Sequence, residues 1–225
     1  MKRGRVLLIN PRMCRPHSVR LPLSVLALGA ALENRYDYEI VDGNVDADPV
    51  GRALGALNRE PRALVGVTVM PGPQVAPAIE ISAAIRAAHP GTPIAWGGYF
   101  PTLYPEAAIN ALYVDYVVRG QGEQTFLDLL AKLPDPDEAA HRDIRGLTWK
   151  RNGLVVHNPE RGFTRPDEFP LLPYDRLGDV SRYLRPSFMG SRTAVHQCAI
   201  GCRYHCTFCG VVSMFNGHTQ AEARA

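Results

Sequence analysis

The chain has 225 residues, of which 46% are apolar and 21% are charged, and its formal net charge is +3. These values are ordinary for a globular protein of one or two domains. The scattered Lys and Arg residues form no basic stripe of the kind that binds nucleic acid. No stretch reaches the length of a transmembrane helix, and the apolar run at residues 6–9 is too short for a signal peptide. We therefore expect a cytoplasmic protein, whose clustered cysteines are metal ligands or catalysts rather than disulfides.

From residue 5 to about residue 132, short β-rich runs alternate with helical stretches. This alternation predicts an α/β fold with a parallel, doubly wound sheet covered by helices on both faces. If the strand order is flavodoxin-like, 2-1-3-4-5, the loops after strands one, three and four converge on one ligand crevice. The expected strands are 5–9, 38–42, 63–69, 93–98 and 115–120, and the expected helices are 22–34, 49–59, 75–90, a short helix from Pro105, and 123–133.

The pattern changes after the polar break PDPDEA at residues 134–139. Residues 146–157 alternate around Asn152-Gly153, which predicts a β-hairpin. Residues 158–190 contain five prolines and few apolar runs, which is typical of a linker lying over a surface. Residues 191–197 are expected to form one more strand, which leads directly into a cysteine-rich segment.

The cysteines Cys202, Cys206 and Cys209 have the spacing C-x3-C-x2-C. Three thiolates so close together on a loop can bind one face of an iron–sulfur cluster and leave its fourth iron open for chemistry. A structural zinc site is the main alternative, in which His196, His205 or Cys198 completes a set of four ligands. The odd number of cysteines argues against a disulfide framework.

The stretch GCRYHCTFCG, at the end of a predicted strand, resembles the signature of radical S-adenosylmethionine (radical SAM) enzymes. The resemblance implies that Cys202, Cys206 and Cys209 hold a 4Fe–4S cluster and that S-adenosylmethionine chelates the open iron. It also implies that Phe208 lies against the adenine of that cofactor. Cys198 falls outside the pattern, so a structural role is expected for it.

The N-terminal region resembles the cobalamin-binding domain that precedes the radical SAM barrel in one large group of these enzymes. LLINP, GGYFPT, DYVVRGQGE and DEFPLLPYDRL each resemble a segment of that group. Carried over residue by residue, Thr68 to Met70 match the S-x-L element of that group, and Gly97-Gly98 match its double glycine. Both elements would flank the nucleotide tail of the corrinoid. The residues so implied in cofactor binding are Thr68, Val69, Met70, Gly97, Gly98 and Thr102. Judged without the resemblance, Gly97 and Gly98 could simply form a tight turn.

The chain also departs from cobalamin proteins in general. The D-x-H-x-x-G element that supplies a histidine to cobalt is absent, and His17 is the one histidine in the loop after the first strand. We therefore expect no protein histidine on the cobalt. Glu123, next to Gly122, either favours a helix N-terminus or faces the cofactor crevice as in the resembling group.

These features predict a cobalamin-binding domain at 1–140, a hairpin and interdomain linker at 141–190, and an incomplete start of a radical SAM barrel at 191–225. Since a barrel needs about 200 residues or more, the sequence is expected to be an N-terminal fragment of a longer enzyme or a truncated gene product. The resemblance implies radical methyl transfer to an unactivated centre of a small-molecule or lipid substrate, with flavodoxin or ferredoxin as electron donor. The alternative is a non-enzymatic cobalamin carrier or sensor with a structural zinc site.

Overall fold

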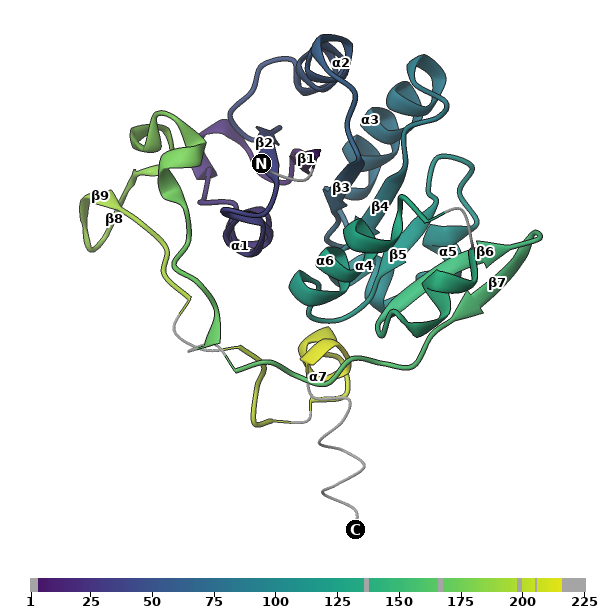
Figure 1. Ribbon diagram of the computed structural model, residues 1–225. Coiled ribbons are helices and arrows are strands. Elements are labelled where there is room, and N and C mark those ends of the chain that lie inside the picture. The colour runs from purple at the N-terminus through teal and green to yellow at the C-terminus, as the bar shows by residue number, and fades with distance from the viewer. Residues whose placement is uncertain (1–3, 136–137, 166–167, 198–199, 205, 216–225) are drawn as a thin grey trace.

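The computed structural model describes residues 4–135, 138–165, 168–197, 200–204 and 206–215 (Figure 1). Within them, a seven-stranded sheet has the order β2-β1-β3-β4-β5-β6-β7. Strands β1 to β5 are parallel, so the predicted flavodoxin-like order is confirmed. These strands are β1 (Arg5–Asn10), β2 (Asp37–Asp42), β3 (Leu64–Thr68), β4 (Ile94–Gly97) and β5 (Tyr116–Val118).

Two apolar cores lie on the two faces of the sheet. One core is covered by α1 (Leu23–Leu32) and α6 (Glu123–Lys132), and the other by α2 (Pro49–Arg59), α3 (Val75–Ala88) and α5 (Pro105–Ile109). Successive residues of β1 alternate between the cores, which explains why the run is continuously apolar. Helix α2 begins at Pro49, where the side chain of Asp48 caps it by accepting from the Gly51 amide at 2.8 Å.

The predicted hairpin is confirmed as β6 (Leu147–Arg151) and β7 (Leu154–His157), with Asn152 and Gly153 both at positive φ in the turn. Strand β6 pairs antiparallel with β5, so the hairpin extends the same sheet. The short helix η2 (Glu138–Asp143) leads into it. The proposed division of the chain into domains stays a prediction.

The predicted linker does lie over a surface. After β7 the chain passes along one side of the domain and reaches α1 and β2, where it forms η4 (Tyr174–Leu177) and η5 (Val180–Tyr183) (Figure 1). Tyr183 is buried there against Val19 and Leu21. The Arg176 guanidinium donates to both carboxylate oxygens of Glu33, at 2.8 and 3.0 Å.

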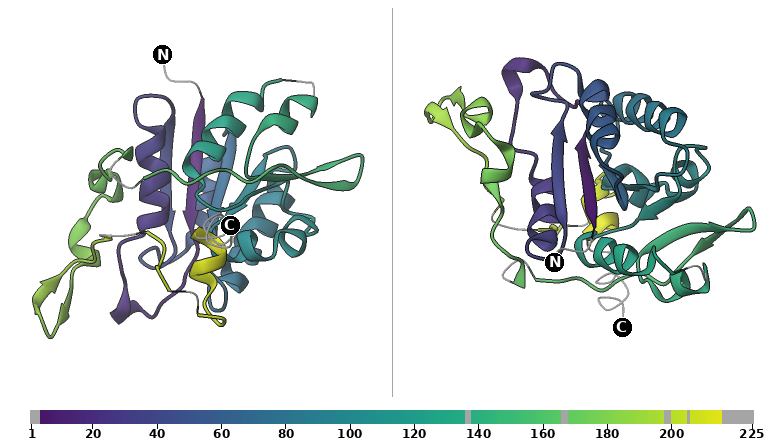
Figure 2. Two further views of the ribbon diagram at one scale, coloured as in Figure 1. Left: turned by 90° about the horizontal axis from the view of Figure 1, so that it is seen from below. Right: turned by 45° about the horizontal axis from the view of Figure 1, so that its top comes forward.

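The last predicted strand differs from the structure. In place of 191–197, a shorter strand β9 (Gly190–Thr193) pairs antiparallel with β8 (Arg185–Ser187), because β8 directly precedes it and offers the nearest backbone partner. This hairpin projects from the body of the protein in both views of Figure 2. The chain then returns to the sheet, where α7 (Gly210–Phe215) contacts α4 (Tyr99–Leu103) (Figure 2).

Candidate functional site

A cavity of about 360 Å³ lies at the C-terminal edge of the sheet. Its walls come from α1 and α6, and its mouth from the loops that follow β1, β3, β4 and β5. The cavity is therefore close to the point where the strand order reverses between β1 and β3, which is where open α/β sheets bind ligands.

The floor of the cavity is made of small residues on neighbouring strands. Gly66 of β3 pairs in register with Ala95 of β4, and Thr68 pairs with Gly97. Because side chains alternate along a strand, these positions share one face of the sheet. A Cβ at Gly66 would lie 2.9 Å from the ring of Phe126 on α6. The ring of Phe126 therefore packs directly over Gly66, and the open part of the floor lies at Gly97.

The two adjacent glycines, Gly97 and Gly98, have different structural roles. Gly98 has a φ of +95°, and a Cβ there would lie 3.1 Å from both Thr68 Oγ1 and the Val69 carbonyl oxygen. Gly98 therefore allows the loop after β4 to approach the loop after β3 closely. A Cβ at Gly97 would make only ordinary contacts, at 3.5 Å or more, with Val118. Gly97 is the glycine that leaves open space at the floor.

The structure brings together some of the predicted cofactor-binding residues and not others. Four of them line the cavity, namely Thr68, Met70, Gly97 and Gly98. Val69 is fully buried in the core on the opposite face. Thr102 accepts a hydrogen bond from the Gly120 amide at 2.9 Å, so it holds the loop after β5 in place. Neither residue is part of the cavity lining, and His17 is exposed on η1 (Pro16–Ser18).

A buried glutamine ties the cavity loops together. Gln74, only 1% exposed, accepts from the Met70 amide at 2.7 Å. Its amide group donates to Asn10 Oδ1 and to the Pro11 carbonyl, both at 2.8 Å. Gln74 thus joins the loop after β3 to the end of β1. Sequence analysis missed Gln74, since a polar residue before a helix gives no sign of long-range partners.

The network continues to the end of β2. Asp42 Oδ1 accepts from Asn10 Nδ2 at 2.9 Å and from the amide and side chain of Asn44 at 3.0 Å each. Asn44 Oδ1 accepts from the amides of Met13 and Cys14, at 2.9 and 3.0 Å. These bonds fix the loop that carries Met13 and Cys14 into the cavity lining. The register of Asn10 opposite Asp42 is the signal that could have revealed the pair.

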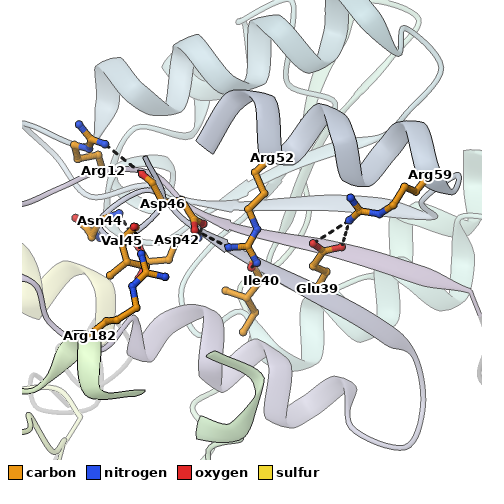
Figure 3. A network of polar contacts seen from close by, with 10 residues as sticks. All are labelled: Arg12, Glu39, Ile40, Asp42, Asn44, Val45, Asp46, Arg52, Arg59 and Arg182. Carbon is orange, nitrogen blue, oxygen red and sulfur yellow. Dashed lines mark hydrogen bonds and ion pairs between the residues drawn. The ribbon is translucent and has the colours of Figure 1, made fainter. Parts of the chain in front are cut away.

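Figure 3 shows the charged groups around Asp42. Arg52 donates to Asp46 Oδ1 at 2.6 Å, Arg12 donates to the Asp46 carbonyl at 3.3 Å, and Arg182 donates to the Val45 carbonyl (Figure 3). Burial raises the pKa of Asp42 above its usual range. Burial, followed by the nearby Asp42, also raises the pKa of Tyr183. The linker therefore packs its tyrosine against the same carboxylate that organises the loops.

Glu123 stands at the cavity edge as the first residue of α6. Burial raises the pKa of its carboxyl group. The neighbouring Arg119 donates instead to the Asn158 carbonyl, on the side of the β6–β7 hairpin.

The cysteine segment lies beside the cavity. Gln197, Ile200 and Met214 contribute to the lining. Cys202 and Cys206 are exposed, Cys209 is half-buried, and none of the three takes part in a disulfide. The Cys209 amide donates to the Cys206 carbonyl at 3.1 Å.

The thiols are not gathered around one point. Within the part of the chain that the structure describes, no three Cys, His, Asp or Glu side chains come close enough together to hold a metal ion. The Phe208 side chain is 91% exposed and lies outside the cavity lining. Cys198 and His205 fall outside the described residues, so the alternatives that include them stay untested.

Across the described ranges, no helix combines the length and apolar character needed to cross a lipid bilayer. The cellular location stays a prediction.

Comparison with known proteins places the site in context. The family model for the B12 binding domain matches residues 17–130. An uncharacterized methyltransferase of Pyrococcus horikoshii is 27% identical over 190 residues, which cover 84% of this chain and 40% of the relative. Cytidylyl-2-hydroxyethylphosphonate methyltransferase of Streptomyces wedmorensis is 26% identical over 140 residues, which cover 50% of this chain and 26% of the relative.

Solved structures with the same fold include the radical S-adenosylmethionine methyltransferase TsrM from Kitasatospora setae, with cobalamin and a [4Fe-4S] cluster bound. It matches with a TM-score of 0.68 and 23% identity over 96% of this chain and 42% of TsrM. The cobalamin-dependent S-adenosylmethionine radical enzyme OxsB, with aqua-cobalamin bound, matches with a TM-score of 0.68 and 24% identity over 80% of this chain and 25% of OxsB. The chain thus spans less than half the length of these proteins.

Proposed function

The chain belongs to the B12-binding domain family, and on that premise we propose that the cavity at the edge of its sheet holds the nucleotide tail of a corrinoid. The hollow floor carries this proposal. A flat aromatic base needs a slot without large side chains on one side, and Ala95 and Gly97 of β4 provide that space. The apolar walls from α1 and α6 suit burial of such a base.

Each group of residues has a distinct task in this proposal. Gly97 and Thr68 would face the tail, while Gly98 keeps the two loops close enough to form the slot. Met13 and Cys14 would lie beneath the corrin ring, on the loop that Asn44 holds in place. A bound cobalamin would supply cobalt-centred methyl or radical chemistry, and the protein would bind, orient and shield it.

For the cysteine segment we propose a 4Fe–4S cluster held by Cys202, Cys206 and Cys209, with S-adenosylmethionine on its open iron. Support comes from the spacing of the three cysteines and from the position of the segment beside the cavity. The described loop does not yet gather the thiols, so we derive no chemical step through the cluster. The exposed ring of Phe208 would be available to lie against an adenine.

The activity proposed for the whole protein is radical methyl transfer to an unactivated centre. The names of the relatives support methyl transfer, although the chain spans 40% of the Pyrococcus relative and 42% of TsrM. A small-molecule or lipid substrate and an electron donor such as flavodoxin or ferredoxin complete the proposal. A non-enzymatic cobalamin carrier with a structural zinc site is the competing function, and metal analysis of the purified protein separates the two.

The test of the corrinoid proposal is Gly97→Val in the full chain, titrated with cobalamin by equilibrium dialysis and visible absorption. The new methyl groups would occupy the floor, so we expect binding about 10- to 100-fold weaker, equivalent to the roughly 1–3 kcal/mol that overpacking costs. Circular dichroism should report an unchanged fold, because a Cβ at Gly97 makes only ordinary contacts.

Gly91→Val is the matched control, since a Cβ at Gly91 meets no atom within 4 Å. This variant should bind cobalamin as the wild type does. Unchanged cobalamin affinity in a folded Gly97→Val protein would show that the floor of the cavity does not contact the corrinoid. A wild-type chain that binds no corrinoid would refute the proposal.

A further inference from the structure

The edge of the cavity contains an acidic side chain that the proposed function leaves without a task. Glu123 lines the cavity together with Phe126 of the same helix and the loop residues 120–122. Its Oε2 atom is closed off from solvent and has no hydrogen-bonding partner among the described residues. A carboxylate in that position would leave part of its negative charge unsolvated, which is costly.

The surroundings of Glu123 favour its neutral form. A hydrogen bond from its own backbone favours the anion. Burial outweighs this bond and raises the pKa of Glu123. A neutral carboxylic acid can donate a hydrogen bond, whereas a carboxylate only accepts.

Among the described residues, the charged groups on the neighbouring elements do not neutralise the charge of a Glu123 carboxylate. In the described part of the chain, Glu123 takes part in no ion pair: Arg119 donates to the Asn158 carbonyl, and Arg161 from the linker pairs with Asp128. The other titratable groups that line the cavity come from the loop after β1 and from α4, and they are Cys14, Arg20 and Tyr99.

We propose that Glu123 is a specificity-determining residue, which donates a hydrogen bond from its carboxylic acid to an acceptor ring nitrogen on the base of the bound corrinoid. The inference rests on the proposed function, in which the base lies in the slot between α1 and α6. Benzimidazole and purine bases carry such a nitrogen and phenolic bases do not. Glu123 therefore selects corrinoids by the chemistry of their lower base.

The experiment compares wild type, Glu123→Gln and Glu123→Met in the full chain. Each protein is titrated with cobalamin, with p-cresolylcobamide, whose phenolic base lacks the nitrogen, and with cobinamide, which lacks the nucleotide tail. Gln keeps a neutral donor, so it should bind cobalamin within about threefold of wild type, whereas Met should bind it about tenfold more weakly. For p-cresolylcobamide, the affinities of the three proteins should differ from one another by less than about threefold, and the same should hold for cobinamide.

The pH dependence provides a second measurement that needs no destabilised variant. Wild-type affinity for cobalamin should fall as the pH rises through the raised pKa of Glu123, because the donor proton is lost. Glu123→Gln retains Cys14, Arg20 and Tyr99, so any slope that it shares with wild type belongs to those groups. The part of the pH dependence of cobalamin affinity that wild type shows and Glu123→Gln lacks comes from Glu123.

Three results would overturn the inference. If Glu123→Gln binds cobalamin as weakly as Glu123→Met, or if wild-type affinity rises with pH, the group acts as an anionic acceptor. If Met weakens cobinamide and cobalamin equally, Glu123 does not contact the base. A wild-type protein that binds neither corrinoid would instead refute the proposed function, and this inference with it.

Discussion

The cavity and the cysteine segment lie at the same edge of the sheet, but they differ in how they are built. Gln74 and Asp42 join the ends of β1, β2 and β3 through buried hydrogen bonds around the cavity. In the cysteine segment, Cys202 and Cys206 are exposed and the three thiols do not converge within the described residues. A buried polar network fixes one arrangement of its loops, whereas exposed thiols on a loop are free to be ordered by a metal.

On the proposed functions, this difference would separate a corrinoid site that packing forms in advance from a cluster site that its metal has to assemble. The slot depends on strand register and on residues of both cores, so it exists as soon as the domain folds. A three-cysteine site gains its geometry from metal–sulfur bonds, because binding and local folding are coupled in such sites. The two sites should therefore respond independently to mutation.

The largest expected effect is on the amount of iron that the reconstituted protein holds. Anaerobic reconstitution of the full chain with iron and sulfide should give a brown protein with roughly four irons per chain. Cys202→Ala, Cys206→Ala and Cys209→Ala should each reduce the iron content to near zero, because each removes one of three protein ligands. Cobalamin affinity should stay within about twofold of wild type in all three, since none of these residues lines the cavity.

Cys14→Ala and Cys198→Ala serve as controls and should retain the iron. Cys14 contacts Asn44 at 3.1 Å through its sulfur, and Cys198 is outside the described residues. One tightly bound zinc, with no capacity for iron, would favour the structural zinc alternative. Loss of cobalamin affinity in the Cys202, Cys206 and Cys209 variants would show that the two sites are not independent.

A smaller effect is expected from Gln74→Ala, which removes the junction between two cavity loops. The variant leaves the Met70 amide without its partner, and the buried Asn10 loses a donor. We expect a decrease of about 2 kcal/mol in the free energy of unfolding, as for other buried groups that lose their hydrogen bonds. Urea denaturation measures it.

Gln124→Ala is the matched control, because Gln124 is exposed and its side chain donates a hydrogen bond to Asp128 one turn along α6. Its effect should stay within about 0.5 kcal/mol. Equal stability of the two variants would mean that the network does not hold the cavity loops in place.

The sequence predicted the sheet better than it predicted the site. Continuous apolar runs and regular alternation with helices were sufficient for the parallel strands, since burial on both faces leaves a strong pattern. The strand order was instead taken from flavodoxin-like folds that share this alternation. The hairpin at Asn152-Gly153 was equally clear from the sequence. Its pairing with β5 was not, because no pattern in a single sequence identifies which strand a hairpin will lie beside. The strand predicted at 191–197 is shorter in the structure, where it is β9 (Gly190–Thr193).

For the site, the resemblance pointed to Thr68, Gly97 and Gly98 as cofactor-binding residues, and all three line the cavity, while their binding role stays a prediction. Val69 was included because the motif is contiguous, but residues alternate in an extended chain, and its side chain enters the opposite core. The floor residues Gly66 and Ala95 become visible only once the register of β3 against β4 is known. Gln74 binds partners more than sixty residues away, which no local pattern encodes.

The smallest effect is expected at Asp42, a residue only 2% exposed at the end of β2. Because burial raises its pKa in the folded state, the folded protein favours the protonated form. The stability that Asp42 contributes is then fully present below the pKa of the unfolded chain, and it is lost as the pH rises through the folded pKa. Asp42→Asn keeps an oxygen for the donors from Asn10 and Asn44 while removing the charge.

We therefore expect Asp42→Asn to match wild type near pH 4 and to gain about 1 kcal/mol in the free energy of unfolding by pH 7. Urea denaturation at several pH values measures the difference. Asp143→Asn removes one exposed carboxylate and corrects for net charge alone. If Asp42→Asn is instead less stable at pH 7 than at pH 4 relative to wild type, the carboxylate is needed as an anion, and the cavity loops are held by charge as well as by neutral hydrogen bonds.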